Sequence, residues 1–520
     1  MPGRDSSAMR ILYSLHRWLG IAAGLMLVIW YGSGLYVHWR ALPSVLTSEE
    51  QHRAAGSPLK LSDPAIDFGG ILQAYGHRPC KEIRLRRAGS RLVYEIRPVT
   101  GRGEIIDAQT GTTLSPIDPP LAEEIAQGFA PGVAIGASTL LQEPDTYSSR
   151  LQMPVYRVGF SDDQRTAVYI DPNTGSILAR ARTRERMYYL FGSIPHFLNF
   201  NVPAFRKNDA LRNGLLFTLN AMVGMIVLSG MAVGIGLIVR QGFLGGLGTK
   251  HIVLRTLHYL FGLGFAVTTL LFIVSGFFYV SNGSPPPARV LPKSDELARV
   301  VHPLAMGSAR MLSATWKEVA GNNAAADFRL VVLKQILDVP VYQFHPANGP
   351  SFALRGDTGT PLIIDEPWLH RVAETFLGRP GTAGDVRYLR DYDDYYYARD
   401  GRIPALPVYR FRDNDPGGTM LYLSAVTGEV LGSAPPDFQA FRWLITGFHA
   451  WDWPFLLHRP VLRDTVIVFL VVGGLIFSLS GLYLGFLYLT KRSESARGNG
   501  NLVAQEESHG DSNISNRSGR

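Results

Sequence analysis

The residues with the clearest chemical potential in this 520-residue chain are histidines in or beside long apolar stretches. His16 and His258 lie near the start of two such stretches, and His196 and His449 lie shortly before two others. Ionisable side chains are costly inside a bilayer, so histidines at these places indicate function. A neutral imidazole is a good axial ligand for haem iron, and electron transfer requires two strong ligands without an open position.

The four histidines form two pairs, because their neighbours repeat. His16 and His258 each precede a Ser-Gly dipeptide by 17 residues, at Ser33 and Ser275. Both lie roughly 8 Å along a helix beyond the start of their apolar stretch. His196 and His449 each follow a short aromatic run. We therefore predict two b-type haems, because a four-helix bundle can hold such a cofactor between facing helices. The alternative is that these histidines, near the span ends, only hydrogen-bond at the level of the lipid headgroups.

Other candidate ligands and contacts are weaker. His38 and His458 have no counterpart in the repeat and indicate interfacial residues, although either could substitute as an outer ligand. Arg17 suits a haem propionate, a lipid phosphate or simple anchoring. Aromatic side chains near the His196 and His449 pair suit either a porphyrin or an interfacial belt: Phe197, Phe200, Trp443, Trp451 and Trp453. The histidines of the polar segments lack metal-ligand spacing: His77, His302, His345 and His370.

Four stretches are long and apolar enough to cross about 30 Å of hydrocarbon. They are residues 11–37, 215–239, 252–280 and 466–489. Buried helices of soluble proteins normally carry a polar stripe, which these stretches lack. The sequence therefore predicts a polytopic α-helical membrane protein in which both long intervening segments lie on one side.

The predicted organisation follows the four spans. Residues 1–39 hold the N-terminus and the first span, 211–240 the second span, 241–251 a loop, 252–280 the third span and 463–490 the fourth. Segments 40–210 and 281–462 are each expected to form an outside domain that ends in a His-bearing interfacial segment. The Ser/Asn/Gly-rich tail, 491–520, is expected to be disordered.

Basic residues predict the orientation. Arg4 and Arg10 precede the first span, Arg240 and Arg255 flank the loop between the second and third spans, and Lys491 follows the fourth. All these flanks fall on one side, which the positive-inside rule makes cytoplasmic. We therefore expect a multi-pass protein of the bacterial inner membrane with both termini cytoplasmic and both large segments periplasmic.

Composition excludes several function classes. The single cysteine, Cys80, cannot form an internal disulfide, an iron–sulfur site or a four-cysteine zinc site. No phosphate-binding loop, dinucleotide fingerprint or HExxH motif is present. The formal net charge is +8, but no Lys/Arg-rich run suggests nucleic-acid binding. An electron donor must therefore be external, either a quinol in the lipid bilayer or a reductase partner.

Three blocks recur in the same order and predict an internal duplication. The first is the apolar stretch with its His and Ser-Gly. The second begins with Val-Tyr-Arg, at Val155 and Val408, and ends near Thr-Gly. The third is the aromatic segment that carries His196 or His449. Each half therefore contains a span, an outside domain, a His-bearing segment and a second span.

The outside segments contain short alternating strands that end in Thr-Gly turns, with helix-like pieces between them. We expect small α+β modules, two per half. Asp107 and Asp171 are expected to hydrogen-bond to their own turn backbone, while the glycine supplies a positive φ. The acidic and aromatic segment from Asp391 to Tyr397 has hard oxygen donors that suit ferric iron, but a solvated loop is the simpler interpretation. The first half has only Asp145 and Tyr147 there, so such a site would be asymmetric.

The Tyr-Ile-Asp-Pro-Asn-Thr-Gly-Ser-Ile-Leu hairpin resembles the repeat of PepSY domains, and the His-Arg-Trp-Leu-Gly opening with a late Ser-Gly resembles PepSY-associated transmembrane proteins. The resemblance covers nearly all the chain except the tail. It implies an iron-regulated inner-membrane protein with PepSY-like periplasmic domains. It also implies the activity of some members, which are haem-containing reductases that release iron from siderophores in the periplasm.

The leading hypothesis is transmembrane electron transfer through haem to a periplasmic acceptor such as a ferric siderophore. Two alternatives remain. A haem-free uptake permease would need polar residues along several spans, and the spans have few, mainly Ser33, Asn220, Ser229, Thr268, Thr269, Ser275, Ser478 and Ser480. A membrane-anchored periplasmic binding or regulatory module would leave the paired histidines without a role.

Overall fold

The computed structural model describes residues 5–39, 46–75, 78–148, 151–198, 208–241, 252–281, 294–304, 306–323, 325–399 and 403–514. The chain divides into two compact units. The helical unit comprises Met1–Trp39, Leu190–Pro285 and Trp443–Arg520, and the sheet unit comprises Arg40–Tyr189 and Pro286–Arg442. The sequence predictions for His77, Phe200 and most of the loop 241–251 lie outside the described residues.

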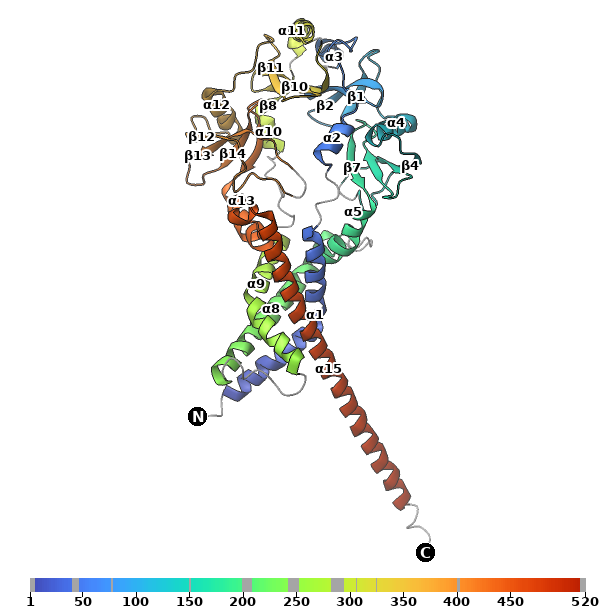
Figure 1. The fold of residues 1–520 in the computed structure, drawn as a ribbon, viewed down its shortest axis with the longest axis vertical. Coiled ribbons are helices and arrows are strands. Elements are labelled where there is room, and N and C mark those ends of the chain that lie inside the picture. Colours follow the sequence, from blue (N-terminus) through green and yellow to red (C-terminus); the bar gives the residue numbers. More distant parts are fainter. Residues whose placement is uncertain are drawn as a thin grey trace. The chain divides into compact units, whose positions relative to one another are not determined.

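Four helices of the helical unit are long and apolar enough to cross a membrane, among the residues searched. They are α1 (Asp5–Trp39), α8 (Asp209–Gln241), α9 (Ile252–Ser281) and α15 (Pro460–Ile514), which confirms the four predicted spans. Helices α1 and α9 each pack against both α8 and α15. These contacts close a ring of four helices, and Figure 1 shows α1, α8, α9 and α15 gathered in one bundle.

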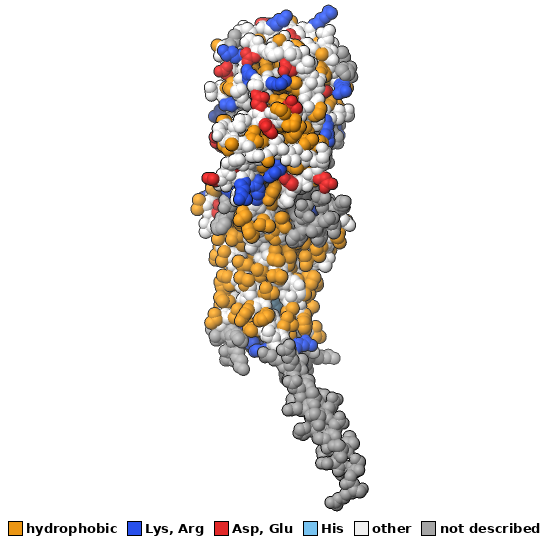
Figure 2. Space-filling view, turned by 90° about the vertical axis from the view of Figure 1, so that its right-hand side faces the viewer, with side chains coloured by type: hydrophobic (Ala, Val, Ile, Leu, Met, Phe, Trp, Pro, Cys, Tyr) orange, Lys and Arg blue, Asp and Glu red, His pale blue; other side chains and the backbone are white. Residues whose placement is uncertain are grey.

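The outer surface of this bundle is apolar. Leu25, Val239 and Phe469 are 56%, 80% and 65% exposed, and Figure 2 shows hydrophobic side chains over the visible face of the helices. A continuous exposed apolar surface of this kind marks contact with a membrane or partner, and the backbone of a helix is satisfied without water. The chain is therefore a membrane protein whose lipid-facing surface is this bundle.

Helix α15 runs to Ile514, well beyond the apolar span. The sequence prediction was different, with a disordered tail from Lys491 onward. Extending an existing helix adds a hydrogen bond for each residue without a new nucleation step, so a span can continue into a polar segment.

The sheet unit contains three sheets, and the largest is built from both halves of the chain. Its strands follow the order β11-β10-β9-β1-β2-β3, and β8 also pairs with β9. The first half supplies β1 (Cys80–Ala88), β2 (Arg91–Pro98) and β3 (Glu104–Asp107); the second supplies β8 (Val301–His302), β9 (Phe328–Ile336), β10 (Val339–Pro346) and β11 (Phe352–Arg355).

Strands β1 and β9 join the two halves. They pair antiparallel, with Glu82 opposite Lys334 and Leu85 opposite Val331. Separate outside domains at 40–210 and 281–462 were expected, whereas the two segments share one sheet. The pairing covers what would otherwise be an exposed sheet edge on each half.

Each half adds a four-stranded antiparallel sheet, which gives the two modules per half that the turns predicted. The strands of the first half are β4 (Ile135–Leu141), β5 (Val155–Phe160), β6 (Ala167–Ile170) and β7 (Ile177–Ala181). Those of the second half are β12 (Gly384–Leu389), β13 (Val408–Asp413), β14 (Met420–Ser424) and β15 (Val430–Ala434).

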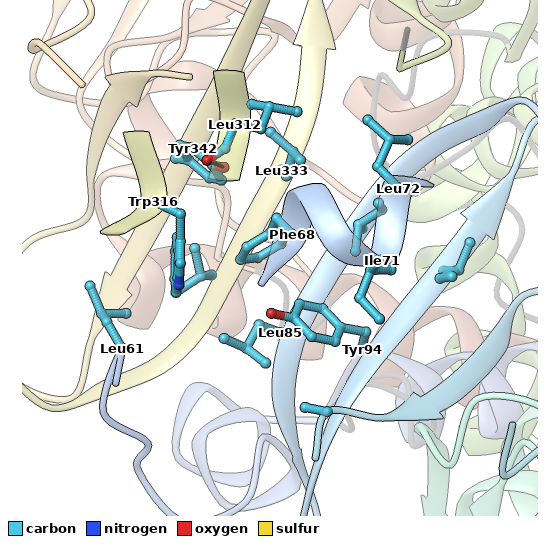
Figure 3. Close-up of a cluster of buried hydrophobic side chains, with 14 of the residues drawn as sticks. Leu61, Phe68, Ile71, Leu72, Leu85, Tyr94, Leu312, Trp316, Leu333 and Tyr342 are labelled. Carbon is cyan, nitrogen blue, oxygen red and sulfur yellow. Dashed lines mark hydrogen bonds between the residues drawn. The ribbon is translucent and has the colours of Figure 1, made fainter. Parts of the chain in front are cut away.

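Two layers of helices bury the sheets. Helices α3 (Phe68–Tyr75) and α11 (Ala309–Asn322) contribute Phe68 and Trp316 to one core of the shared sheet, together with Tyr94 and Tyr342 (Figure 3). Helices α4 (Pro119–Phe129) and α12 (Glu366–Leu377) each contribute to a core between the shared sheet and a four-stranded sheet. The remaining helices are α2 (Ser48–Ala54), α5 (Thr183–Met187), η1 (Tyr188–Ser193), α6 (Ile194–Phe197), α10 (Ser294–Val300), η2 (Met306–Ser308), α13 (Pro436–Phe441), η3 (Arg442–Gly447) and α14 (Pro454–Leu457).

The Thr-Gly turns have the predicted structure. Asp107 accepts hydrogen bonds from the backbone of Gln109 and Thr110, and Asp171 accepts one from the backbone of Asn173. The turn glycines have positive φ, 72° at Gly111 and 64° at Gly175 among them. These aspartates are therefore structural.

An ion pair lies within the first half of the sheet unit. Arg86 donates from Nε to Glu95 at 2.8 Å, and both side chains are buried. Burial by itself would raise the pKa of Glu95, but Arg86 and Arg97 outweigh it and hold the pKa at about 2. Because this pKa lies below that of an unfolded glutamate, about 4.3, the pair stabilises the fold above that pH. The contribution is lost as the pH falls towards 2.

We expect Glu95→Gln to destabilise the sheet unit by about 3–5 kcal/mol at pH 7, because it leaves Arg86 buried without its anion. Thermal unfolding of the detergent-purified chain, followed by circular dichroism, measures this loss. The stability of the variant should also depend less on pH between 5 and 2 than the stability of the parent. Glu104→Gln is the matched control, because its partner Arg78 is exposed and surface pairs contribute about 0–1 kcal/mol. Equal losses in both variants would contradict the assignment.

Candidate functional site

The structure brings the four predicted histidines together as two pairs inside the helical unit. The ring centres of His16 and His258 are 6.1 Å apart, and those of His196 and His449 are also 6.1 Å apart. We call these the His16 pair and the His196 pair. His16 and His258 lie on α1 and α9, whereas His196 lies on α6 and His449 follows η3.

This spacing suits one metal ion between two imidazoles. An imidazole nitrogen binds a first-row metal ion such as zinc at about 2.0–2.1 Å. The nitrogen lies about 1.2 Å from the ring centre, so two rings on opposite sides of one ion have centres roughly 6.4 Å apart. Among the described residues, no group of three or more His, Cys, Asp or Glu side chains is placed to hold a metal ion. A pair of imidazoles is therefore the ligand set that the bundle offers to such an ion.

Backbone carbonyls fix the tautomer of the His16 pair. Nδ1 of His16 lies 3.0 Å from the carbonyl oxygen of Ile226, and Nδ1 of His258 lies 3.0 Å from that of Phe477. A carbonyl can only accept, so Nδ1 carries the proton in both rings. The lone pair of each neutral imidazole is then on Nε2, the nitrogen available to a metal.

Serine hydroxyls have the same effect on the His196 pair. Nδ1 of His196 lies 3.1 Å from Oγ of Ser33, and Nδ1 of His449 lies 2.9 Å from Oγ of Ser275. Ser33 donates its own proton to the carbonyl of Ile29, and Ser275 donates to that of Leu271. Each hydroxyl therefore accepts from Nδ1–H, and the lone pair is again on Nε2. Burial, and then the neighbouring His449, lowers the pKa of His196 to about 3, which keeps this imidazole neutral.

A glycine follows the serine beside every one of these histidines. A Cβ at Gly34 would lie 3.3 Å from the His196 ring, and one at Gly230 would lie 2.8 Å from the His16 ring. At Gly481 the corresponding distance to the His258 ring is 2.6 Å, and at Gly276 the His449 ring is 3.9 Å away. Thus a Ser-Gly dipeptide in each of the four spans faces one imidazole. Ser33 and Ser275 were recognised from the repeat, whereas Ser229-Gly230 and Ser480-Gly481 are visible in the sequence but were not predicted to face a histidine.

The His196 pair is positioned by a structure that the sequence did not predict. Two π-helices, η1 and η3, come directly before the two histidine segments. Two residues after each histidine the backbone turns left-handed, at Leu198 (φ 50°) and Trp451 (φ 56°). π-Helices are rare and often occur at functional sites. The indole Nε1 of Trp30 also donates to the carbonyl of His196, which anchors that segment to α1.

The remaining candidates lie elsewhere. His38 is 3.1 Å from Asp464, and His458 is an exposed residue at the end of α14. Arg17 stacks on Tyr488, 4.2 Å from the ring centre. Three histidines of the sheet unit lie apart from one another and contact protein groups: His302 the carbonyl of Arg299, His345 the hydroxyl of Ser351, and His370 both Glu366 and the Phe411 ring. The predicted aromatic neighbours are partly present, since Phe197 lies 4.9 Å from the His196 ring and Trp451 packs on the bundle core.

The acidic and aromatic segment 391–397 is a structural loop. Asp393 accepts from the backbone of Tyr396, from the hydroxyl of Tyr422 and from Arg410. Tyr396 is buried and stacks on Tyr422 at 4.6 Å. In the first half Asp145 has the equivalent role, because it accepts from the backbone of Tyr147 and Ser148 and from the hydroxyl of Tyr169. Asp145 and Asp393 therefore have equivalent roles, and each accepts hydrogen bonds from its own loop. The asymmetry between the halves that was expected for this segment does not apply to these two aspartates.

We expect Gly481→Ala to lower the stability of the helical unit by about 1–3 kcal/mol, because the new methyl group would overlap the His258 ring. Thermal unfolding in detergent measures the loss. Gly262→Ala on α9 is the matched control, since a Cβ there meets no atom within 4 Å. It should be neutral or slightly stabilising, because alanine favours a helix over glycine. A Gly481→Ala variant as stable as the control would contradict this packing.

Comparisons with known proteins agree with the membrane bundle. A search of curated proteins found no match. The family model described as "PepSY-associated TM region" matches residues 13–325, more than half of the chain, and confirms the resemblance seen in the sequence. The chain therefore belongs to the PepSY-associated TM region family.

Proposed function

We propose that the chain is a haem-binding electron-transfer protein of the bacterial inner membrane. Electrons would come from a quinol or a reductase partner and pass to a periplasmic acceptor such as a ferric siderophore. The observation that carries this proposal is the pair of matched imidazole couples, each with the spacing for one metal ion and the lone pair on Nε2. When bound, b-type haem would supply one-electron transfer between ferrous and ferric iron.

A buried nitrogen atom supports a haem near the His196 pair. Nε1 of Trp451, two residues after His449, is buried and has no hydrogen-bond partner within the described part of the chain. A buried donor without a partner costs free energy, so such a group needs an explanation. A haem carries two propionate carboxylates, and this indole would suit one of them. Arg463 is already engaged, since it pairs with Asp452 at 3.0 Å and its Nε lies 3.8 Å from Asp464.

The distance between the pairs suits a membrane crossing. His16 and Ser33 lie on the same helix, 17 residues apart, as do His258 and Ser275. At 1.5 Å per residue this separation is about 25 Å along the axis. The hydrocarbon core of a bilayer is about 30 Å thick. The serines that hold the His196 pair therefore lie nearly a membrane's width from the His16 pair.

Aromatic side chains fill the space between the two pairs. Nδ1 of His258 bonds to the carbonyl of Phe477, and the Phe477 ring lies 6.1 Å from that of Tyr31. The Tyr31 ring lies 6.3 Å from that of Phe272, which lies 5.7 Å from the ring of His449. The hydroxyl of Tyr31 is 2.7 Å from Thr269, so the ring is fixed at both ends. This continuous contact path supports electron transfer between the pairs.

The two pairs differ in a way that favours one direction of transfer. A carbonyl oxygen at 3.0 Å is the nearer acceptor for each Nδ1 of the His16 pair, with the Ser229 and Ser480 hydroxyls at 3.3 and 3.5 Å. In the His196 pair, hydroxyls accept from Nδ1. A carbonyl is the stronger acceptor and makes the imidazole a better donor to ferric iron. The His16 pair would then give the lower reduction potential. Electrons would run from the His16 pair to the His196 pair, which the positive-inside rule places on the periplasmic side.

The alternatives have less support. A permease needs a polar path through the spans, but the polar side chains predicted for it are engaged within their own helices. Ser33, Asn220, Ser229, Thr268, Thr269, Ser275, Ser478 and Ser480 each donate to a carbonyl of the preceding turn. A periplasmic binding or regulatory module would give the histidines no task. We also propose that the repeated order of elements in the two halves reflects duplication.

The first test is a reduced-minus-oxidised optical spectrum of the detergent-purified chain, with haem quantified as the pyridine complex. We expect two b-type haems per chain. His16→Ala or His258→Ala should remove one haem, and His196→Ala or His449→Ala should remove the other. His370→Ala is the control and should retain both. Two haems in every variant, or none in cells that make haem, would overturn the proposal.

A second test concerns the acceptors of the histidines. Ser275→Ala removes the hydroxyl that accepts from Nδ1 of His449 and should raise the reduction potential of one haem, because the imidazole becomes a weaker donor. Ser480→Ala is the matched control, since His258 keeps the carbonyl of Phe477. A spectroelectrochemical titration measures both. A potential that falls or stays constant in Ser275→Ala would contradict the argument for direction.

A further inference from the structure

The first four-stranded sheet carries a hollow that none of the preceding functions uses. It has a volume of about 540 Å³ and lies beside strands β4 and β5, the turn before β6 and helix α5. Three arginines line it, Arg157, Arg165 and Arg186. Small side chains open it, at Gly136, Ala137 and Gly159. A volume of this size suits a small molecule, since ligand pockets span about 300–1,000 Å³.

The arginines have little negative charge to balance them. Within the described residues neither Arg165 nor Arg186 has a carboxylate within 4 Å. The guanidinium carbon of Arg186 lies 5.7 Å from the ring centre of Tyr147. Arg157 is 3.8 Å from Asp145, whose oxygens already accept from its own loop and from Tyr169. Its counterpart Arg410 is closer to its aspartate, at 3.0 Å.

Arg165 is held in an unfavourable backbone conformation. Its φ is 49°, in the left-handed region, which costs a residue other than glycine roughly 1–2 kcal/mol. The equivalent residue of the second half is Gly418, with φ 55°, and both close the same turn onto an aspartate carbonyl. The first half therefore has an arginine where the backbone favours glycine. Strain of this kind clusters at functional sites.

The second half fills the equivalent space. Counting from Val155 and Val408, Gly159 corresponds to Arg412. The Arg412 guanidinium lies about 4 Å from where a Cβ of Gly418 would be, so it lies against the turn. Arg186 corresponds to Gln439, whose amide donates to the carbonyls of Gly418 and Ala434. The same fold thus has a hollow lined by arginines in one half, whereas in the other half an arginine and a glutamine lie against the equivalent turn.

We propose that this hollow binds a small polyanion that carries several carboxylate groups. Guanidinium groups recognise carboxylates through paired, charge-assisted hydrogen bonds. Three such groups around a space larger than a single oxyanion favour a molecule with more than one negative group. Asp145 and Asp162 accept hydrogen bonds from Tyr169 and Thr166 respectively, and of the three arginines only Arg157 has a carboxylate within 4 Å among the described residues. This site requires no haem, so it stands apart from the proposed electron transfer.

The test is isothermal titration of the full-length, detergent-purified chain with citrate, with inorganic phosphate as a separate titrant. Arg165→Gly and Arg186→Gln install the residue type of the second half, and each should weaken citrate binding at least about tenfold. Gly159→Arg should abolish binding because it fills the hollow as Arg412 does. Arg184→Gln is the matched control, since Arg184 is exposed on the same helix and does not line the hollow.

The Gly159→Arg variant separates a shaped site from general attraction. It adds a positive charge, so citrate binding that stays equal or becomes tighter would overturn the proposal. An equal loss of citrate affinity in the control Arg184→Gln would also overturn the proposal. Phosphate that binds as tightly as citrate would overturn the assignment to a polycarboxylate. A melting temperature for Arg165→Gly at or above that of the parent shows that lost binding is not lost folding.

Discussion

The hydrogen bonds of four imidazoles set the arrangement of the membrane bundle. An N–H group without a partner costs several kcal/mol in an apolar medium, so each Nδ1–H must meet an acceptor on another segment. His16 finds one on α8, His258 on α15, His196 on α1 and His449 on α9. Each bond therefore joins two segments and also fixes the tautomer. One constraint thus determines both how the helices pack and which ring nitrogen keeps its lone pair.

Much of this arrangement could be predicted from the sequence, because the signals are local. Long apolar stretches predict spans, Thr-Gly predicts turns, and repeated neighbours predicted which histidines would pair. The partners of Nδ1 could not be predicted, because no local pattern shows that the carbonyls of Ile226 and Phe477 face a distant helix. The π-helices before His196 and His449 were missed for a similar reason. Their hydrogen-bond pattern depends on tertiary packing and leaves no strong signature in composition.

The shared sheet shows a second limit of local reasoning. Alternation of apolar residues predicted strands and even the number of modules, but each half was expected to fold by itself. In the structure β1 and β9 pair edge to edge, so the two halves complete each other's sheet. Which edges meet depends on the register of two segments about 250 residues apart. The same order of elements occurs in both halves, on either side of that pairing. Equivalent positions of the two halves can therefore be compared directly.

That comparison identifies the places where the halves differ, and the proposals for Tyr31 and for the hollow near Arg165 rest on these differences. The structural aspartates Asp145 and Asp393 have the same contacts in both halves, so they explain folding and little else. Tyr31 has no aromatic counterpart, because Ile273 occupies the equivalent position in α9. Arg165 likewise replaces a glycine at a turn where glycine costs less. A repeat keeps what both copies need for stability. Where one half has a residue that its local backbone conformation disfavours and the other half has the favoured residue, stability does not explain the difference. The side chain of that residue then needs another explanation.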